Sequence, residues 1–179
     1  MCIFVNVIDF QKEIQQLDLY SKRIIGIDYG SHKIGIALSD EDRCIAFKQE
    51  ILIGDWNNLL STAVTLLKTC EKYNSNIVVI GFPKKLDGSL SENCKKIIQT
   101  AKLLDKEYVK KNNKNISILL FDERFTTKAT ISVFNTKIGK NFCKKNKTND
   151  NKLDDAGAAC IILNDVLTAT NKNSLKSLK

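Results

Sequence analysis

The chain has 179 residues, enough for one domain with a sizeable core and too few for two large lobes. Its 28 lysines and arginines against 20 aspartates and glutamates give a net charge of +8, which favours a polyanionic partner such as nucleic acid, although a lysine-rich composition can also reflect an AT-rich genome. The N-terminus is a poor match to a signal peptide, and no apolar run approaches the length needed to span a membrane. There is no C-x-x-C pair, and His32 is the only histidine. We therefore expect a soluble, cytoplasmic protein that has reduced thiols, no zinc site of the usual spacing and no membrane partner.

Strand patterns dominate the first third of the chain. Residues 1–21 are interpreted as a loosely ordered N-terminal extension that contains at most a short amphipathic helix through Ile14 and Leu17. Apolar runs at 23–29, 33–38 and 43–53 predict three strands, and their short connections indicate an antiparallel meander. Asp55 is the predicted N-cap of a helix that ends near Lys72.

Alternating strands and helices follow. Residues 76–82 predict a fourth strand, which Pro83 ends because proline cannot donate to a sheet. The spacing of Ser89-Leu90-Ser91-Glu92 predicts a capped helix to about Tyr108. A fifth strand at 115–121, a helix capped near Thr126, a lysine-rich loop and a helix at 152–169 complete the pattern. The predicted fold class is α/β, with a mixed five-stranded sheet (three antiparallel strands, then parallel strands) flanked by helices in one domain at 22–170, followed by a basic tail at 171–179.

Asp28 places a carboxylate inside a near-continuous apolar strand. Such a strand is typically covered on both faces, where an unpaired carboxylate is costly unless a cation or a strong donor meets it. Gly30 follows, and a residue without Cβ allows a sharp turn and the close approach of a ligand. The alternative is that Asp28 only caps a β-turn.

Two further acidic sites lie at the ends of buried elements. Asp122 and Glu123 end the fifth strand, and strand alternation sends them to opposite faces, so only one of them can line a given site. Asp154 and Asp155 open a helix that is apolar almost all round. The alternative to a site role is that they only stabilise the helix through its dipole. Parallel strands would bring the strand-end acids to the same edge as Asp28. Carboxylates gathered there without histidine favour Mg²⁺ or Mn²⁺ over zinc.

Four sequence blocks, in this order, resemble the signature blocks of the YqgF/RuvX family. They are GIDYGSHKIGIA (26–37), GFPKKLDGS (81–89), DERFTT (122–127) and DDAGAA (154–159). Members of that family are described as pre-16S ribosomal RNA nucleases and as Holliday-junction-resolvase-like proteins with an RNase H-like fold. The resemblance covers about 22–167. Lys85 stands where an asparagine is common, and the first twenty-odd residues have no family counterpart.

The resemblance implies a two-metal nuclease whose catalytic, metal-binding carboxylates are Asp28, Glu123 and Asp154, with Asp122 and Asp155 as further metal-ligand candidates. The implied cofactor is Mg²⁺ or Mn²⁺, and two such ions about 4 Å apart would activate water and stabilise the leaving oxygen of a phosphodiester. The expected function is processing of the 5′ end of precursor 16S rRNA during ribosome biogenesis. The expected partners are structured RNA and a pre-ribosomal particle, with the chain acting as a monomer or homodimer. Resolution of branched DNA is the alternative.

Basic and hydroxyl side chains near these blocks are the predicted nucleic-acid contacts. The lysine-rich loop before Asp154 includes the ring of Phe142 and is typical of a phosphate-tracking segment, although a solvated loop is the alternative. A helix start near Thr126 offers free N–H groups to a phosphate. His32 is interpreted as a surface turn residue. The predicted contacts are Arg124, Thr126, Thr127, Lys33, Lys84, Lys137, Lys140, Lys144, Lys145 and Lys147.

Two other function classes fit parts of the sequence. Residues 26–31 also resemble the phosphate-binding hairpin of actin and sugar-kinase ATPases, but those proteins enclose ATP between two lobes of this type, and 179 residues supply one. A nucleic-acid-binding regulator that does not cleave would be marked by the loss of one acid. All three predicted acids are present.

Overall fold

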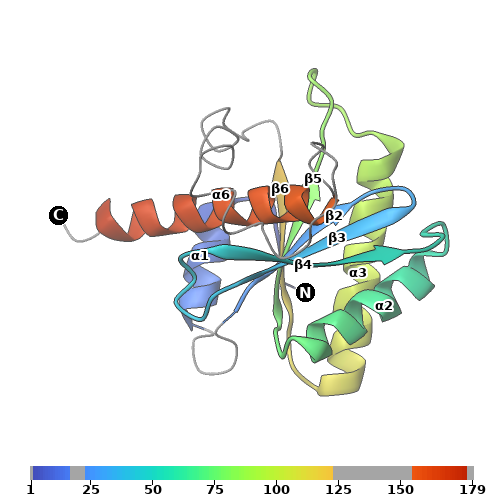
Figure 1. Ribbon diagram of the computed structural model, residues 1–179, viewed down its shortest axis with the longest axis horizontal. Coiled ribbons are helices and arrows are strands. Elements are labelled where there is room, and N and C mark those ends of the chain that lie inside the picture. The colour runs from blue at the N-terminus through green and yellow to red at the C-terminus, as the bar shows by residue number, and fades with distance from the viewer. Residues whose placement is uncertain (1, 17–22, 123–154, 177–179) are drawn as a thin grey trace, which may run out of the picture.

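A computed structural model describes residues 2–16, 23–122 and 155–176 of the chain (Figure 1). None of the helices in these ranges has the length and apolar character needed to cross a bilayer. The elements, in chain order, are β1 (Cys2–Phe4), α1 (Val7–Gln16), β2 (Ile25–Tyr29), β3 (Lys33–Ser39), β4 (Ala46–Ile53), α2 (Leu59–Lys72), β5 (Ile77–Phe82), α3 (Glu92–Asn112), β6 (Ser117–Asp122) and α6 (Asp155–Lys176). The helix predicted near Thr126 and the lysine-rich loop lie outside the described residues.

The strands form one mixed sheet in the order β1-β6-β5-β2-β3-β4. β2, β3 and β4 are antiparallel, whereas β5 pairs in parallel with both β2 and β6, which confirms the predicted mixture. The described sheet has six strands and not the predicted five, because β1 pairs in parallel with β6 from Cys2–Ser117 to Phe4–Leu119. A strand of three residues is too short to show alternation in the sequence.

Helices cover both faces of the sheet (Figure 1). α2 and α3 pack on one face, and α6 and α1 pack on the other. In β2, Ile25, Ile27 and Tyr29 belong to the core under α2 and α3, whereas Ile24, which precedes the strand, belongs to the core under α6. Burial on both faces explains why the central strands are almost continuously apolar.

Residues 2–16 pack into the fold, so the expectation of a loosely ordered segment before Lys22 is wrong for them. The predicted amphipathic helix is present as α1, in which Phe10 and Ile14 are 0% and 3% exposed. Gln11 Nε2 donates to the carbonyl of Thr170 at 2.8 Å, which ties α1 to α6. β1 also covers the edge of β6, whose unpaired backbone groups would otherwise be open to another chain.

Four predicted helix boundaries move, and one of them is the end of α3, which lies at Asn112 and not near Tyr108. Asn58 caps α2 by accepting from the Ser61 N–H at 3.0 Å, whereas the predicted cap, Asp55, accepts from the Asn57 N–H. Ser91 caps α3, two residues later than predicted. Several neighbouring polar residues can each cap a helix, and packing of the apolar stripe selects among them. α6 continues to Lys176, so the first part of the predicted tail is helical.

Candidate active site

Asp28 lies near the carboxyl end of the central strand β2 and is half-buried. Its cross-strand partner on β3 is Gly35, which places no side chain beside the carboxylate. Ile27 and Tyr29, on either side of Asp28, are buried in the core under α2 and α3. Because successive side chains of a strand point to opposite faces, Asp28 belongs to the face that α6 covers.

Gly26 allows α6 to pack directly against β2. A Cβ at Gly26 would lie 2.8 Å from Leu163 Cβ and 3.0 Å from the Ala159 carbonyl oxygen, so no side chain fits between the strand and the helix. Gly26 is two residues before Asp28 on the same face, or about 7 Å along the strand. α6 begins at Asp155, one turn before Ala159. The contact therefore fixes the amino-terminal end of α6 against the middle of the sheet, on the face of Asp28 (Figure 1).

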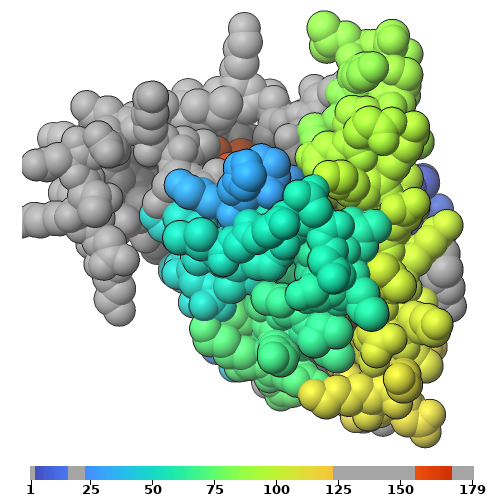
Figure 2. Space-filling model, turned by 90° about the vertical axis from the view of Figure 1, so that its right-hand side faces the viewer, coloured from blue at the N-terminus to red at the C-terminus, as the bar shows by residue number. Residues whose placement is uncertain are grey.

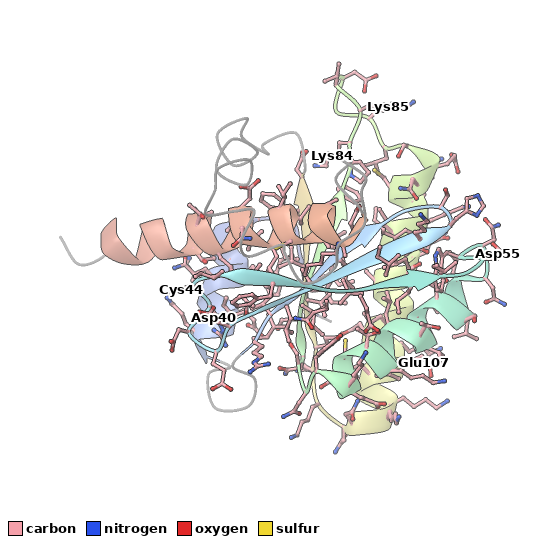
Figure 3. All side chains as sticks on the ribbon, in the orientation of Figure 1. Asp40, Cys44, Asp55, Lys84, Lys85 and Glu107 are labelled. Carbon is pink, nitrogen blue, oxygen red and sulfur yellow. The ribbon has the colours of Figure 1, made fainter. Side chains whose placement is uncertain are left out.

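Asp122 lies on the opposite face from Asp28. Its partner in the parallel register is Phe82, which is buried in the core under α2 and α3, and residues paired in this way share a face. Asp122 Oδ2 is 3.6 Å from Lys84 Nζ, and the side chains of Lys84 and Asp122 are 29% and 14% exposed. Lys84 Nζ also lies 5.6 Å from the centre of the Phe82 ring. This ion pair joins the ends of β5 and β6 at the base of the loop that Figure 3 marks with Lys84 and Lys85.

The start of α3 holds the two turns at this edge of the sheet. Asn93 Nδ2 donates to the Tyr29 carbonyl at 3.4 Å, directly after Asp28 in the chain. Cys94 Sγ donates to the Pro83 carbonyl at 3.2 Å, at the exit of β5. Sequence reasoning missed both contacts, because the polar spacing around Ser91 marks a helix start without showing what the helix touches.

Lys33 and Gly30 form the turn that follows Asp28. The Gly30 N–H donates to the Lys33 carbonyl at 3.0 Å, and a Cβ at Gly30 would lie 2.6 Å from that oxygen, so the turn requires glycine. The Lys33 side chain is exposed, and so is His32, in agreement with its interpretation as a surface turn residue.

The predicted site residues outside the described ranges are Glu123, Arg124, Thr126, Thr127, Lys137, Lys140, Lys144, Lys145, Lys147 and Asp154. Asp155 is described only as the first residue of α6.

The donor chemistry at this edge fits an oxygen-preferring divalent ion. Within 2–16, 23–122 and 155–176, no three His, Cys, Asp or Glu residues gather closely enough to hold a metal. Asp28 supplies hard carboxylate oxygens, which Mg²⁺ and Mn²⁺ prefer. Cys94, the thiol at this edge, is engaged by a backbone carbonyl. Asp28 is therefore chemically suited to contribute oxygen ligands to such an ion, whereas the predicted ligands Glu123 and Asp154 lie outside the described residues.

The mixed sheet with helices on both faces has the RNase H-like fold, which two solved structures share. Thermus thermophilus RuvC in complex with Holliday junction substrate has a TM-score of 0.54 and 10% identity, and the match covers 85% of this chain and 95% of that one. The yeast mitochondrial Holliday junction resolvase Ydc2 has a TM-score of 0.51 and 15% identity, and the match covers 98% of this chain and 100% of that one. At these identities the likeness is one of fold.

The chain belongs to the RuvX family, whose profile is described as Holliday junction resolvase and matches residues 22–169. A Rickettsia bellii protein named "Putative pre-16S rRNA nuclease" is 36% identical over 166 residues, which cover 93% of this chain and 99% of the relative. A Rickettsia felis protein of the same name is 37% identical over 161 residues, which cover 90% of this chain and 96% of the relative.

Proposed function

We propose that this chain is a nuclease that depends on a divalent metal ion and processes the 5′ end of precursor 16S rRNA. The observation that carries the proposal is the position of Asp28, a half-buried carboxylate on the central strand, on the face against which α6 begins. The names of the Rickettsia relatives, which match nearly the whole chain, support a precursor rRNA as the substrate.

Glu123 is the second carboxylate of the proposed site, in preference to Asp122. Asp122 faces the side of α2 and α3 and is paired with Lys84, whereas Asp28 faces α6. Glu123 follows Asp122 directly, and one further step of strand alternation would assign it to the face of Asp28. Asp154 directly precedes α6 and is the third carboxylate. These three residues would hold Mg²⁺ or Mn²⁺, which as Lewis acids stabilise charge on the attacking and leaving oxygens of a phosphodiester.

The predicted phosphate contacts divide into three groups. Lys33, exposed beside the turn that follows Asp28, is proposed to bind a phosphate near the cleaved bond. Lys84 is already paired with Asp122, so its proposed role is to hold the ends of β5 and β6 together. Arg124, Thr126, Thr127 and the lysines between 137 and 147 remain proposed phosphate contacts, on the strength of their charge and position in the sequence.

Cleavage of branched DNA is the second candidate function. The family description names Holliday junction resolvases, and the RuvC structure with the same fold holds such a substrate. Both candidates place hydrolysis of a phosphodiester at the same proposed carboxylates. The two candidates therefore differ only in the nucleic acid that is cleaved.

Side-by-side cleavage assays separate the candidates. The purified protein is given an RNA that spans the 5′ end of precursor 16S rRNA, or a four-way DNA junction, with Mg²⁺, with Mn²⁺ or with excess EDTA. We expect metal-dependent cutting of the RNA and no cutting in chelator. Junction cutting without RNA cutting would select the second candidate, and undiminished RNA cutting in EDTA would rule out the metal-dependent mechanism.

A further inference from the structure

A row of exposed lysines follows the outer face of α3. Lys102, Lys106 and Lys110 succeed one another at intervals of four residues, so they lie on one side of the helix. Within the described part of the chain, none of the three side chains has a hydrogen bond or an ion pair. Like charges at this spacing oppose helix formation, so the row is not explained by the stability of α3.

Four other lysines, on α2 and α3, are partnered. The pairs are Lys95 with Glu92 at 2.6 Å, Lys96 with Asn57 at 2.9 Å, Lys111 with Glu71 at 2.6 Å and Lys72 with Glu50 at 2.8 Å. Lysines that flank the row thus have hydrogen-bond or ion-pair partners, whereas the side chains of Lys102, Lys106 and Lys110 have none among the described residues. Three unpartnered cations in line form a surface suited to successive phosphates.

α3 leads away from the proposed cleavage site. Asn93, in its first turn, donates to the carbonyl that follows Asp28. At 1.5 Å per residue, Lys102 lies about 15 Å and Lys110 about 27 Å along the helix from its start. Figure 2 shows α3 as a ridge that runs along one side of this face from the loop after β5. A nucleic acid that passes from Asp28 over the edge of the sheet, at the Tyr29 carbonyl, and then lies along this ridge would meet the three lysines in order.

We propose that Lys102, Lys106 and Lys110 bind the backbone phosphates of a duplex arm of the substrate. This assignment rests on the proposed function, because it takes Asp28 as the point from which the arm extends. With a rise of roughly 3 Å per base pair in an RNA duplex, somewhat less than in B-DNA, the row meets the arm about five to nine base pairs beyond the point where the arm passes the start of α3. A shorter arm does not reach Lys106 and Lys110.

The arm-length dependence supplies the test. Binding is measured by fluorescence anisotropy in EDTA, so that it does not depend on cleavage, with two RNAs of identical cleavage-site sequence and arms of about 4 or about 12 base pairs. The variant is Lys106→Gln/Lys110→Gln. Its control is Lys12→Gln/Lys48→Gln, which changes the net charge equally on α1 and β4.

We expect Lys106→Gln/Lys110→Gln to weaken long-arm binding about tenfold and to reduce the slope of log K against log salt by about two units. The same variant should keep the short-arm affinity and the melting temperature of the wild type. The control should keep the wild-type affinity for both RNAs. Equal weakening on both arms, equal weakening by the control, or unchanged binding would overturn the assignment. A wild-type chain that binds the long arm at the row but does not cleave in Mg²⁺ would contradict the proposed function alone, and a chain that binds neither RNA would contradict both.

Discussion

Lys84 Nζ and Asp122 Oδ2, 3.6 Å apart, connect two segments that the sequence separates by 38 residues. Sequence reasoning assigned Lys84 to phosphate binding and kept Asp122 as a possible metal ligand. The pair neutralises both charges in a half-buried setting and holds the end of β6, the residue immediately before Glu123. In the proposed site, Lys84 acts on the metal through the position of β6.

We predict that Lys84→Gln weakens Mn²⁺ binding about three- to tenfold, measured by calorimetry without nucleic acid. The direction is diagnostic because removal of a nearby positive charge would, through electrostatics alone, strengthen cation binding. Lys84→Arg should restore the affinity by keeping the ion pair. Tighter Mn²⁺ binding in Lys84→Gln would show that Lys84 acts as a charge and does not position β6.

Gly26→Ala should destabilise the protein by about 1–3 kcal/mol, because the new Cβ would lie 2.8 Å from Leu163 Cβ and push α6 from the sheet. The free energy of unfolding is obtained from urea denaturation. Mn²⁺ affinity should also fall, since α6 begins beside the proposed site. Gly88→Ala is the control. A Cβ added at Gly88 would meet no atom within 4 Å, and the backbone there has φ +83°. This variant should therefore lose stability through backbone strain while its Mn²⁺ affinity stays unchanged.

The N-terminal segment should contribute to stability, although it lies outside the region that the family profile matches. Phe10→Ala is expected to cost about 3–5 kcal/mol, because the ring is 0% exposed in the core under α6. Ile8→Ala, two residues away and 52% exposed, should cost less than about 1 kcal/mol. Equal effects of the two variants in urea denaturation would show that residues 2–16 do not pack as described.

Cys70 should make stability depend on pH in the alkaline range. Burial, followed by the charge of Glu71, raises the pKa of the thiol from 9.0 to about 12. The folded chain thus retains a proton that the unfolded chain loses, so this contribution is fully present below pH 9 and is lost as the pH rises toward 12. Cys70→Ala should lose less stability than the wild type between about pH 8 and about pH 10.5. An equal loss in both proteins would contradict this assignment.

The central sheet could be predicted from sequence because its signals are local. The apolar run around Asp28 and the short connections to β3 and β4 indicated strands, antiparallel pairing and a misplaced charge. β1 has only three residues, and α3 shows several adjacent polar residues that could each begin a helix. Such short or degenerate signals are decided by packing with distant segments, so the sequence left them open.

The candidate site was predictable in composition and less so in geometry. The sequence places Asp122 and Glu123 on opposite faces but does not say which face Asp28 shares, because that depends on the register of β5 with β6. The lysine row on α3 is visible as a spacing, whereas its lack of partners is a tertiary property. Glu123, Asp154 and the lysine-rich loop lie outside the described residues, so their roles stay predictions.

A single-turnover cleavage assay with three matched variants tests the central claim most directly. Asp28→Asn, Glu123→Gln and Asp122→Asn each remove one carboxylate charge, and each is compared with wild type on the precursor RNA in Mg²⁺, with RNA binding measured in parallel. The account predicts that Asp28→Asn and Glu123→Gln abolish cleavage while RNA binding persists, and that Asp122→Asn retains cleavage. Loss of cleavage in Asp122→Asn together with full activity in Asp28→Asn or Glu123→Gln would contradict it.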